Sequence, residues 1–225
     1  MSFSPSEPEH EIEKSTASFL ERQFDAFIAG RVEPLVPQGI QPNQITLVGF
    51  GFGLLAAISL YLMSFHWGWV VVVVVALVCN TFADSLDGAV ARGRSLTSDR
   101  GFFLDHLLDQ ITFISLFLGV GLSNYAIFGL AVMAAIVSNL HLIIDLFWIQ
   151  LRNKFPLPLI GPIEVRLSAL SLAVLTCFWP GHILTISSLG LGWFDVVNLI
   201  AVPLSFIEFC LSALALYRAL GSSST

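Results

Sequence analysis

Four aspartates lie in two pairs, and each pair repeats at helical spacing. Asp84 and Asp87 are three residues apart in one long apolar stretch, and Asp105 and Asp109 are four apart in the next. Side chains at these spacings share one face of an α-helix. Only the short segment 92–100 separates the two stretches. We therefore expect two antiparallel neighbouring helices whose four carboxylates converge.

Carboxylates gathered in this way need a compensating charge, because nearby negative groups repel one another and would otherwise take up protons. Hard oxygen ligands suit Mg²⁺, Mn²⁺ or Ca²⁺ rather than zinc. Two such ions that share carboxylates would lie about 3.5–4 Å apart, the arrangement used for displacement at phosphorus. Neutralisation by the arginines of segment 92–100 is the alternative. Four acids interleaved with small residues and with Arg92, a suitable phosphate donor, favour the metal site.

The composition is that of a polytopic membrane protein. Of the 225 residues 56% are hydrophobic and 12% are charged, whereas a soluble domain carries roughly 25% charged residues. These proportions exclude a disordered chain, a disulfide scaffold and a nucleic-acid binder. The three cysteines lie in apolar runs at spacings that match no zinc motif, so we expect no disulfide framework. No secretory signal peptide is visible.

Six segments are apolar enough to cross a membrane, which takes about 20 residues. They are residues 45–65, 67–91, 101–121, 125–149, 163–179 and 194–217. The fifth is short and is stopped by Pro180. The valine run 70–75 is interpreted as helix, because an open strand would leave its backbone groups unsatisfied in lipid. The predicted fold is all-α, a polytopic membrane helix bundle with six transmembrane helices and an N-terminal interfacial helix.

All ten basic residues lie on one side of these six segments. They are Lys14, Arg22, Arg31, Arg92, Arg94, Arg100, Arg152, Lys154, Arg166 and Arg218. By the positive-inside rule, both termini and the connections 92–100 and 150–162 face the cytoplasm, which requires an even number of spans. We therefore predict a multi-pass integral membrane protein whose acidic cluster faces the cytoplasm.

The chain divides into a cytoplasmic N-terminal segment of residues 1–44, a six-span domain of residues 45–218 and a tail of residues 219–225. Apolar residues recur at helical spacing in the N-terminal segment. They are Leu20, Phe24, Phe27 and Ile28. This amphipathic helix is expected either to lie along the membrane surface or to pack against the bundle.

Small residues form a stripe on the first predicted span. Gly49, Gly53 and Ala57 are each four residues apart. A small residue at every fourth position lets two helices approach closely in a membrane. The stripe therefore predicts close helix packing rather than a ligand site.

The residues around the aspartates complete a longer pattern. The chain reads DSLDGAVAR over residues 84–92 and then, after eight residues, carries Gly101, Asp105 and Asp109. This DxxDGxxAR-x8-GxxxDxxxD pattern resembles the signature of the CDP-alcohol phosphotransferases, also called CDP-alcohol phosphatidyltransferases. The resemblance implies an integral-membrane enzyme of phospholipid synthesis. Such an enzyme moves a substituted phosphate group from a CDP-linked donor to the hydroxyl of a lipid or polar alcohol, releases CMP and uses two divalent ions, Mg²⁺ or Mn²⁺.

The same resemblance implies a role for each matching position. The metal ligands would be Asp84, Asp87 and Asp105, joined by Asp109. Asp109 would also be the general base that takes the proton of the acceptor hydroxyl. The residues facing the cytidine nucleotide would be Gly88, Ala91 and Gly101, with Arg92 near the pyrophosphate on account of its charge.

Two stretches outside the signature could also contact substrate. Residues 42–46 read PNQIT and resemble the PNxxT element that precedes the first span in this family, which makes Asn43 and Thr46 candidate contacts. The fifth span opens with residues 161–166, GPIEVR, an ordinary helix start that also faces the level of the carboxylates. The residues that could bind a lipid phosphate or the acceptor there are Arg152, Lys154, Glu164 and Arg166.

The donor is open between two branches of this family. One branch moves a phosphatidyl group from CDP-diacylglycerol to a polar alcohol, and the other moves phosphocholine or phosphoethanolamine from CDP-choline or CDP-ethanolamine to diacylglycerol. His106 and the motif Gly161-Pro162-x-Glu164 resemble the second branch. Phe102 and the number of spans favour the first, which we prefer. A homodimer is left open.

A non-enzymatic alternative is a divalent-cation transporter, because four carboxylates in a helix bundle could also conduct ions. Transport sites tend to lie near the membrane midplane at broken helices. The aspartates here are predicted near one surface, and a transporter would not explain the glycine and alanine positions of the signature. We therefore favour the enzyme.

Overall fold

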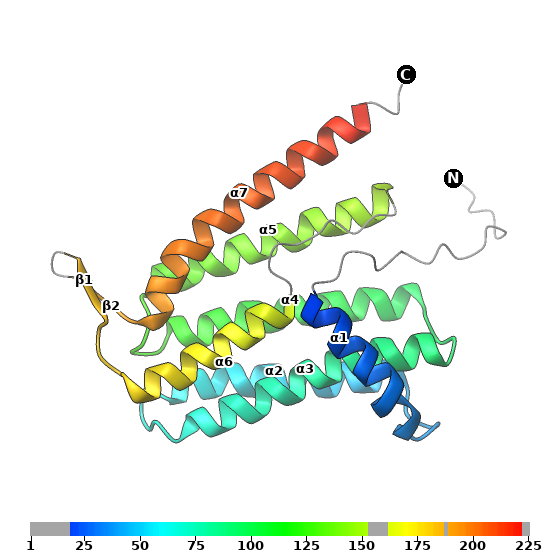
Figure 1. The fold of residues 1–225 in the computed structure, drawn as a ribbon, viewed down its shortest axis with the longest axis horizontal. Coiled ribbons are helices and arrows are strands. Elements are labelled where there is room, and N and C mark those ends of the chain that lie inside the picture. Colours follow the sequence, from blue (N-terminus) through cyan, green and yellow to red (C-terminus); the bar gives the residue numbers. More distant parts are fainter. Residues whose placement is uncertain (1–18, 153–161, 187–188, 222–225) are drawn as a thin grey trace.

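Long helices make up most of the structure, a computed structural model that describes residues 19–152, 162–186 and 189–221 (Figure 1). The helices are α1 (Phe19–Phe27), α2 (Pro42–Leu62), α3 (Trp69–Gly93), α4 (Asp99–Gly121), α5 (Phe128–Arg152), α6 (Pro162–Phe178) and α7 (Trp193–Gly221). A π-helical turn, η1 (Ile28–Val32), and a 3-10 turn, η2 (Glu33–Leu35), follow α1. The predicted helical fold is confirmed. It has one addition, a small antiparallel hairpin of β1 (Leu184–Ile186) and β2 (Leu189–Leu191) before α7.

Five helices of the described chain are long and apolar enough to cross a membrane, namely α2, α3, α4, α5 and α7. The sixth expected span corresponds to α6, which has 17 residues. At 1.5 Å per residue this helix is about 25 Å long, somewhat less than the roughly 30 Å of a hydrocarbon core. The number of six spans therefore stays a prediction. The valine run lies inside α3 and is helical, as predicted.

The first long helix begins earlier than the hydropathy alone indicates. α2 starts at Pro42, where a proline is favoured because the first helical residue needs no hydrogen-bond donor. The side chain of Gln44 caps the start by accepting a hydrogen bond of 2.9 Å from the backbone of Gln41. The last helix is also longer than expected, since α7 continues to Gly221. The helix starting at Pro42 places the PNQIT stretch in the first turns of α2.

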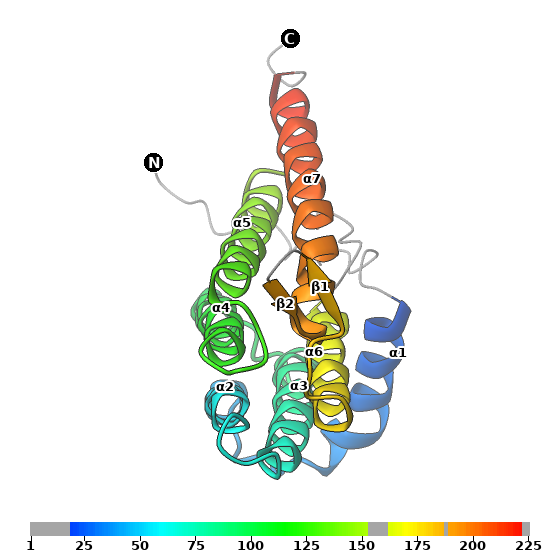
Figure 2. The same ribbon diagram turned by 90° about the vertical axis from the view of Figure 1, so that its left-hand side faces the viewer.

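The helices form a bundle in which α2 packs against both α3 and α4 (Figures 1 and 2). α5 packs against α4 on one side and α7 on the other, while α6 lies along α3. Apolar side chains of α2 to α7 form the main core, among them Leu60, Leu77 and Ala173. α2 is therefore the helix that joins α3 to α4, and α6 packs against α3.

The stripe of small residues on α2 is a packing surface, as predicted. A Cβ atom at Gly53 would lie 2.5 Å from Cγ2 of Thr112 on α4, and one at Gly49 would lie 2.8 Å from Cβ of Ala83 on α3. On the opposite helix, a Cβ atom at Gly119 would collide with the backbone carbonyl of Ala57. The close approach of α2 to its two neighbours therefore depends on these glycines.

The N-terminal segment packs against the bundle, one of the two alternatives left open by its sequence, and a position along the membrane surface stays a prediction. Ile28 is completely buried. The ring of Phe24 meets the ring of Phe82 on α3 edge to face, with centroids 5.0 Å apart. Phe27 is about half exposed. The apolar face of this segment thus covers α3, and its position along that helix is fixed by side-chain packing.

Arg94, just after α3, ties the following turn to the same end of the bundle. Its guanidinium donates hydrogen bonds to the carbonyl oxygens of Val36 at 2.6 Å, Pro37 at 3.2 Å and Ile40 at 3.3 Å. Its Nε also meets Oε1 of Glu33 at 3.3 Å. These contacts hold residues 33–40 against the connection between α3 and α4, immediately before α2 begins.

Candidate active site

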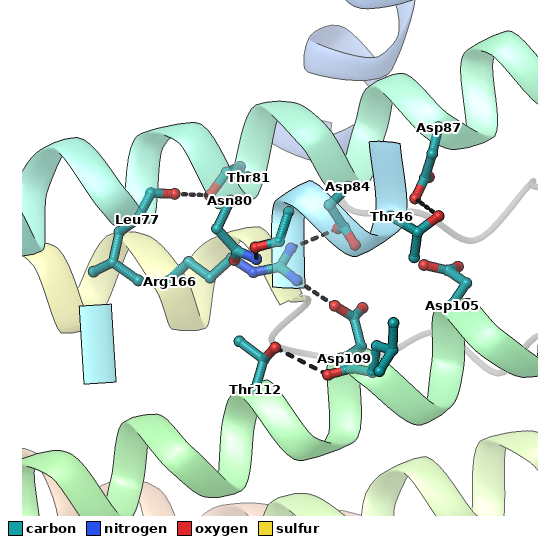
Figure 3. A network of polar contacts seen from close by, with 12 residues as sticks. Thr46, Leu77, Asn80, Thr81, Asp84, Asp87, Asp105, Asp109, Thr112 and Arg166 are labelled. Atoms are coloured by element: carbon teal, nitrogen blue, oxygen red, sulfur yellow. Dashed lines mark hydrogen bonds and ion pairs between the residues drawn. The ribbon is translucent and has the colours of Figure 1, made fainter. Parts of the chain in front are cut away.

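Three of the four motif aspartates converge between α3 and α4 (Figure 3). Asp84, Asp105 and Asp109 each offer one carboxylate oxygen, and these oxygens lie within 4.8 Å of one another. The short connection of residues 94–98 returns the chain toward α3, so that Asp105 and Asp109 of α4 meet Asp84. The convergence predicted for four carboxylates therefore holds for three of them. Several carboxylate oxygens at one point are the donor set that Mg²⁺ and Mn²⁺ prefer, so the residues present fit a divalent ion.

A small pocket is lined by all four aspartates of the motif. Asp87 belongs to it but stands apart from the three converging carboxylates. It is 5% exposed and accepts a hydrogen bond of 2.6 Å from Oγ1 of Thr46. Thr46 lies in the second turn of α2, so this bond joins α2 to α3. A charge-assisted bond of this length fixes the orientation of a buried carboxylate. Thr46, predicted as a candidate contact from the PNxxT element, thus reaches a predicted metal ligand.

An arginine from α6 bridges two of the aspartates (Figure 3). Nη1 of Arg166 donates to Oδ2 of Asp84 at 2.6 Å, and Nη2 donates to Oδ1 of Asp109 at 2.8 Å. Arg166 is 1% exposed, and its Cζ lies 5.2 Å from the ring centre of Phe113. The sequence offered the arginines of segment 92–100 as neutralising charges, but the cation between these acids comes from a more distant helix. A contact of Arg166 with substrate stays a prediction.

The small residues predicted to face a nucleotide have polar neighbours. The guanidinium of Arg92 lies over Gly88, since a Cβ atom there would be 3.0 Å from its Nη1. At the start of α4, a Cβ atom on Gly101 would lie 3.3 Å from Oδ1 of Asn43. Ala91 is half-buried, one turn past the aspartates of α3. Gly88 and Gly101 thus keep side-chain bulk away from Arg92 and Asn43, two groups able to bind a polar ligand.

Apart from Arg166, the described residues predicted to bind a lipid phosphate or acceptor lie at the end of α5 and the start of α6. Arg152 is the last residue of α5, and Glu164 is in the first turn of α6. Oε2 of Glu164 is buried without a hydrogen-bond partner among the described residues. Neither side chain lines the pocket of the aspartates. Lys154 lies outside the described residues.

Two polar residues of the pocket were missed by the sequence reasoning. Asn80 and Thr112 line it, and they are 2% and 1% exposed. The amide nitrogen of Asn80 donates to the carbonyl of Gly49 at 2.9 Å, while its Oδ1 is buried without a partner among the described residues. Asn80 is one helical turn from Asp84, and Thr112 is one turn from Asp109. Helical spacing from the aspartates could therefore have identified both.

The family model described as CDP-alcohol phosphatidyltransferase matches residues 40–207, which is most of the chain and includes the whole site. The chain therefore belongs to the CDP-alcohol phosphatidyltransferase family, a family of membrane-bound enzymes. The several apolar helices agree with a multi-pass integral membrane protein. The family membership favours the enzyme over the cation-transporter alternative.

Curated relatives match a shorter region. An inner membrane protein of Escherichia coli K12, YnjF, is 42% identical over 94 residues, which cover 38% of this chain and 43% of the relative. The archaetidylinositol phosphate synthase of Pyrococcus horikoshii is 36% identical over 90 residues, covering 40% of this chain and 45% of that enzyme. The matched regions thus span less than half the length of these relatives.

A solved structure shares the fold over most of both chains. It is the phosphatidylinositol phosphate synthase of Mycobacterium tuberculosis with CDP-DAG bound. The two proteins superpose with a TM-score of 0.56, covering 86% of this chain and 91% of that one, at 17% sequence identity. This likeness supports the helical bundle as the fold of the family.

Proposed function

We propose that this protein transfers a phosphatidyl group from CDP-diacylglycerol to the hydroxyl of a polar alcohol, with CMP as the leaving group. The observation that carries the proposal is the convergence of Asp84, Asp105 and Asp109 within 4.8 Å, inside a complete family signature. The preference for this donor is supported by the solved relative, which has CDP-DAG bound. Relatives named for archaetidylinositol phosphate and phosphatidylinositol phosphate synthesis make inositol phosphate the first acceptor to test.

The residues that would hold two divalent ions, Mg²⁺ or Mn²⁺, are the three converging aspartates together with Asp87. Ions bound there would offset the charge of the donor pyrophosphate and stabilise the departing CMP. The hydrogen bond from Thr46 keeps Asp87 oriented toward the pocket that all four aspartates line. Acids inside a membrane cost about 2.5–3.5 kcal/mol each on insertion scales. The free-energy cost of placing four acids there supports a functional role for the cluster.

The chain's other residues would bind the donor and move one proton. Asp109 is the proposed base, since a carboxylate beside the acceptor hydroxyl could take its proton as that hydroxyl attacks phosphorus. The bare surfaces of Gly88 and Gly101, with Ala91, leave room for the cytidine nucleotide. Arg92 would donate charge-assisted hydrogen bonds to the phosphates. Direct attack by the acceptor requires no covalent intermediate on the protein.

The test is CMP release by the purified protein in detergent with Mg²⁺. CDP-diacylglycerol is offered with inositol phosphate and a panel of other polar alcohols, and CDP-choline or CDP-ethanolamine is offered separately with diacylglycerol. Asp109→Asn should lower turnover at least about 100-fold, the usual effect of losing a general base. Asp99→Asn, an exposed acid at the start of the same helix, is the matched control and should retain activity.

Two results would contradict the proposal in different ways. CMP release only from CDP-choline or CDP-ethanolamine would reverse the choice of donor and leave the chemistry of the site intact. Wild-type turnover in the Asp109→Asn variant would exclude Asp109 as the base.

A further inference from the structure

Arg166 lies at one side of the aspartate cluster, where its guanidinium meets two of the carboxylates (Figure 3). Its two terminal nitrogens pair with Asp84 and Asp109 at 2.6 and 2.8 Å, and the plane of Phe113 lies near its guanidinium carbon. The side chain is 1% exposed. A buried charge is tolerated only where opposite charges compensate it. The arginine and the two aspartates therefore stabilise one another within the bundle.

The same two aspartates belong to the group that could hold a metal ion. A carboxylate oxygen that accepts a short hydrogen bond from a guanidinium has less electron density to offer a metal ion. A guanidinium this close also repels a divalent cation, and burial leaves that repulsion poorly screened. We therefore expect metal ions that enter the cluster to weaken or break the two ion pairs of Arg166.

We propose that Arg166 is an internal counter-cation that occupies the aspartate cluster in the metal-free protein and competes with the metal ions for Asp84 and Asp109. The inference rests on the metal-dependent reaction proposed above. In the metal-free state Arg166 relieves the repulsion among the carboxylates and keeps α3, α4 and α6 together. Its displacement is part of metal loading, so Arg166 lowers the affinity of the site for metal.

A second role for Arg166 predicts the opposite sign. An arginine that only orients the carboxylates for the metal would act as a positioning residue, and its removal would weaken metal binding. A competing arginine, once removed, leaves a more negative cluster with two more oxygens available, and metal binding becomes tighter. The direction of the change in metal affinity therefore separates the two roles without any measurement of turnover.

The experiment is a calorimetric titration of the purified full chain with Mn²⁺, accompanied by thermal unfolding with and without the metal. Arg166→Met removes the charge and keeps the length of the side chain. Arg218→Met, at an exposed position near the end of α7, removes the same charge far along the chain from the cluster. Arg166→Met should bind Mn²⁺ at least about tenfold tighter than the wild type, because a close unit charge is worth that much even when well screened.

Stability gives a second, independent readout. Without metal, Arg166→Met should melt at a lower temperature than the wild type, since the aspartates lose their counter-charge. With Mn²⁺, its melting temperature should rise by more than that of the wild type. Arg218→Met should match the wild type in both respects. Mn²⁺ binding by Arg166→Met that is equal to or weaker than wild-type binding would overturn the competing role.

Arg166→Lys covers the case in which the methionine variant does not fold. Lysine keeps the charge but cannot bridge two carboxylates with a planar fork, so one aspartate is released. Its affinity for Mn²⁺ should rise by a smaller factor, and an affinity at or below that of the wild type would again contradict the inference. If none of the proteins binds Mn²⁺, the metal-dependent reaction itself is contradicted as well. Equal binding by all of them contradicts the role of Arg166 alone.

Discussion

At the scale of single residues, the aspartates of the signature differ in what holds them. Asp84 and Asp109 share the guanidinium of Arg166, whereas Asp87 takes its hydrogen bond from Thr46. Four identical side chains thus acquire different surroundings from the helices that reach them. The difference matters for function because a metal ligand must be held in orientation, while a general base must be able to accept a proton.

The bond between Thr46 and Asp87 gives a prediction at this scale. Thr46→Val keeps the shape of the side chain but leaves a buried carboxylate without its donor, a loss of about 1–3 kcal/mol. We expect the free energy of unfolding to fall by that amount and turnover to fall with it. Denaturation and CMP release measure the two effects. Thr46→Ser should restore both, because it keeps the hydroxyl.

Thr81→Val is the matched control on α3. Its hydroxyl bonds to the carbonyl of Leu77 in the same helix, at 2.8 Å, so its loss leaves no aspartate unpaired. Turnover should stay near that of the wild type. If Thr46→Val turns over as fast as Thr81→Val, the hydrogen bond to Asp87 has no part in the reaction.

At the scale of elements, the N-terminal segment is attached to the bundle by one arginine and a few apolar side chains. Residues 19–39 precede the region matched by the family model, which begins at residue 40. Arg94 nevertheless binds the carbonyl groups of Val36 and Pro37 in this segment, and Ile28 is buried against α3. The segment leads directly into α2, whose first turns carry Asn43 and Thr46. Its attachment therefore bears on the position of both.

Arg94→Gln tests this attachment. The variant loses most of the hydrogen bonds to the carbonyls of Val36, Pro37 and Ile40, so residues 33–41 should exchange their backbone hydrogens faster. Hydrogen–deuterium exchange detected by mass spectrometry measures this rate. Because α2 begins next to this stretch, KM for the donor should also rise. Arg100→Gln, at an exposed arginine in the first turn of α4, is the control. Unchanged exchange in Arg94→Gln would show that packing alone holds the segment.

At the scale of the whole molecule, the unsettled feature is whether α6 crosses the membrane. The ten basic residues predict an even number of spans with both termini in the cytoplasm. Five spans would place the termini on opposite sides. If α6 crosses, His182 beyond its end and the hairpin that follows lie on the outer side of the membrane. If it does not cross, they lie on the cytoplasmic side.

Cysteine labelling in intact cells distinguishes these arrangements. In a background with Cys79, Cys177 and Cys210 replaced by alanine, Thr97→Cys in the connection after α3 should resist a membrane-impermeant maleimide. His182→Cys, exposed beyond the end of α6, should react with it. Both sites should react once the membrane is permeabilised. Labelling of Thr97→Cys in intact cells would overturn the orientation, and protection of both sites would mean that α6 does not cross.

The sequence by itself determined which face of each helix carries the aspartates, and that both aspartate pairs lie toward the connected ends of the two helices. Helical periodicity fixes the first, and the short connection of residues 94–98 fixes the second, so both depend only on residues close in the chain. The valine run and the stripe of small residues on α2 could be interpreted for the same reason. Lipid permits few backbone structures, and close packing permits few side chains.

Only the tertiary structure decided which groups meet the aspartates. Arg166 is 82 residues from Asp84 and 57 from Asp109, and Thr46 is 41 residues from Asp87. Contacts over such separations depend on how α2 and α6 lie against α3 and α4, which no local pattern encodes. The sequence also did not decide whether the N-terminal helix packs against the bundle, and it gave no sign of the hairpin before α7. Each of these depends on which surfaces the packed helices leave open, and that is set by the whole bundle at once.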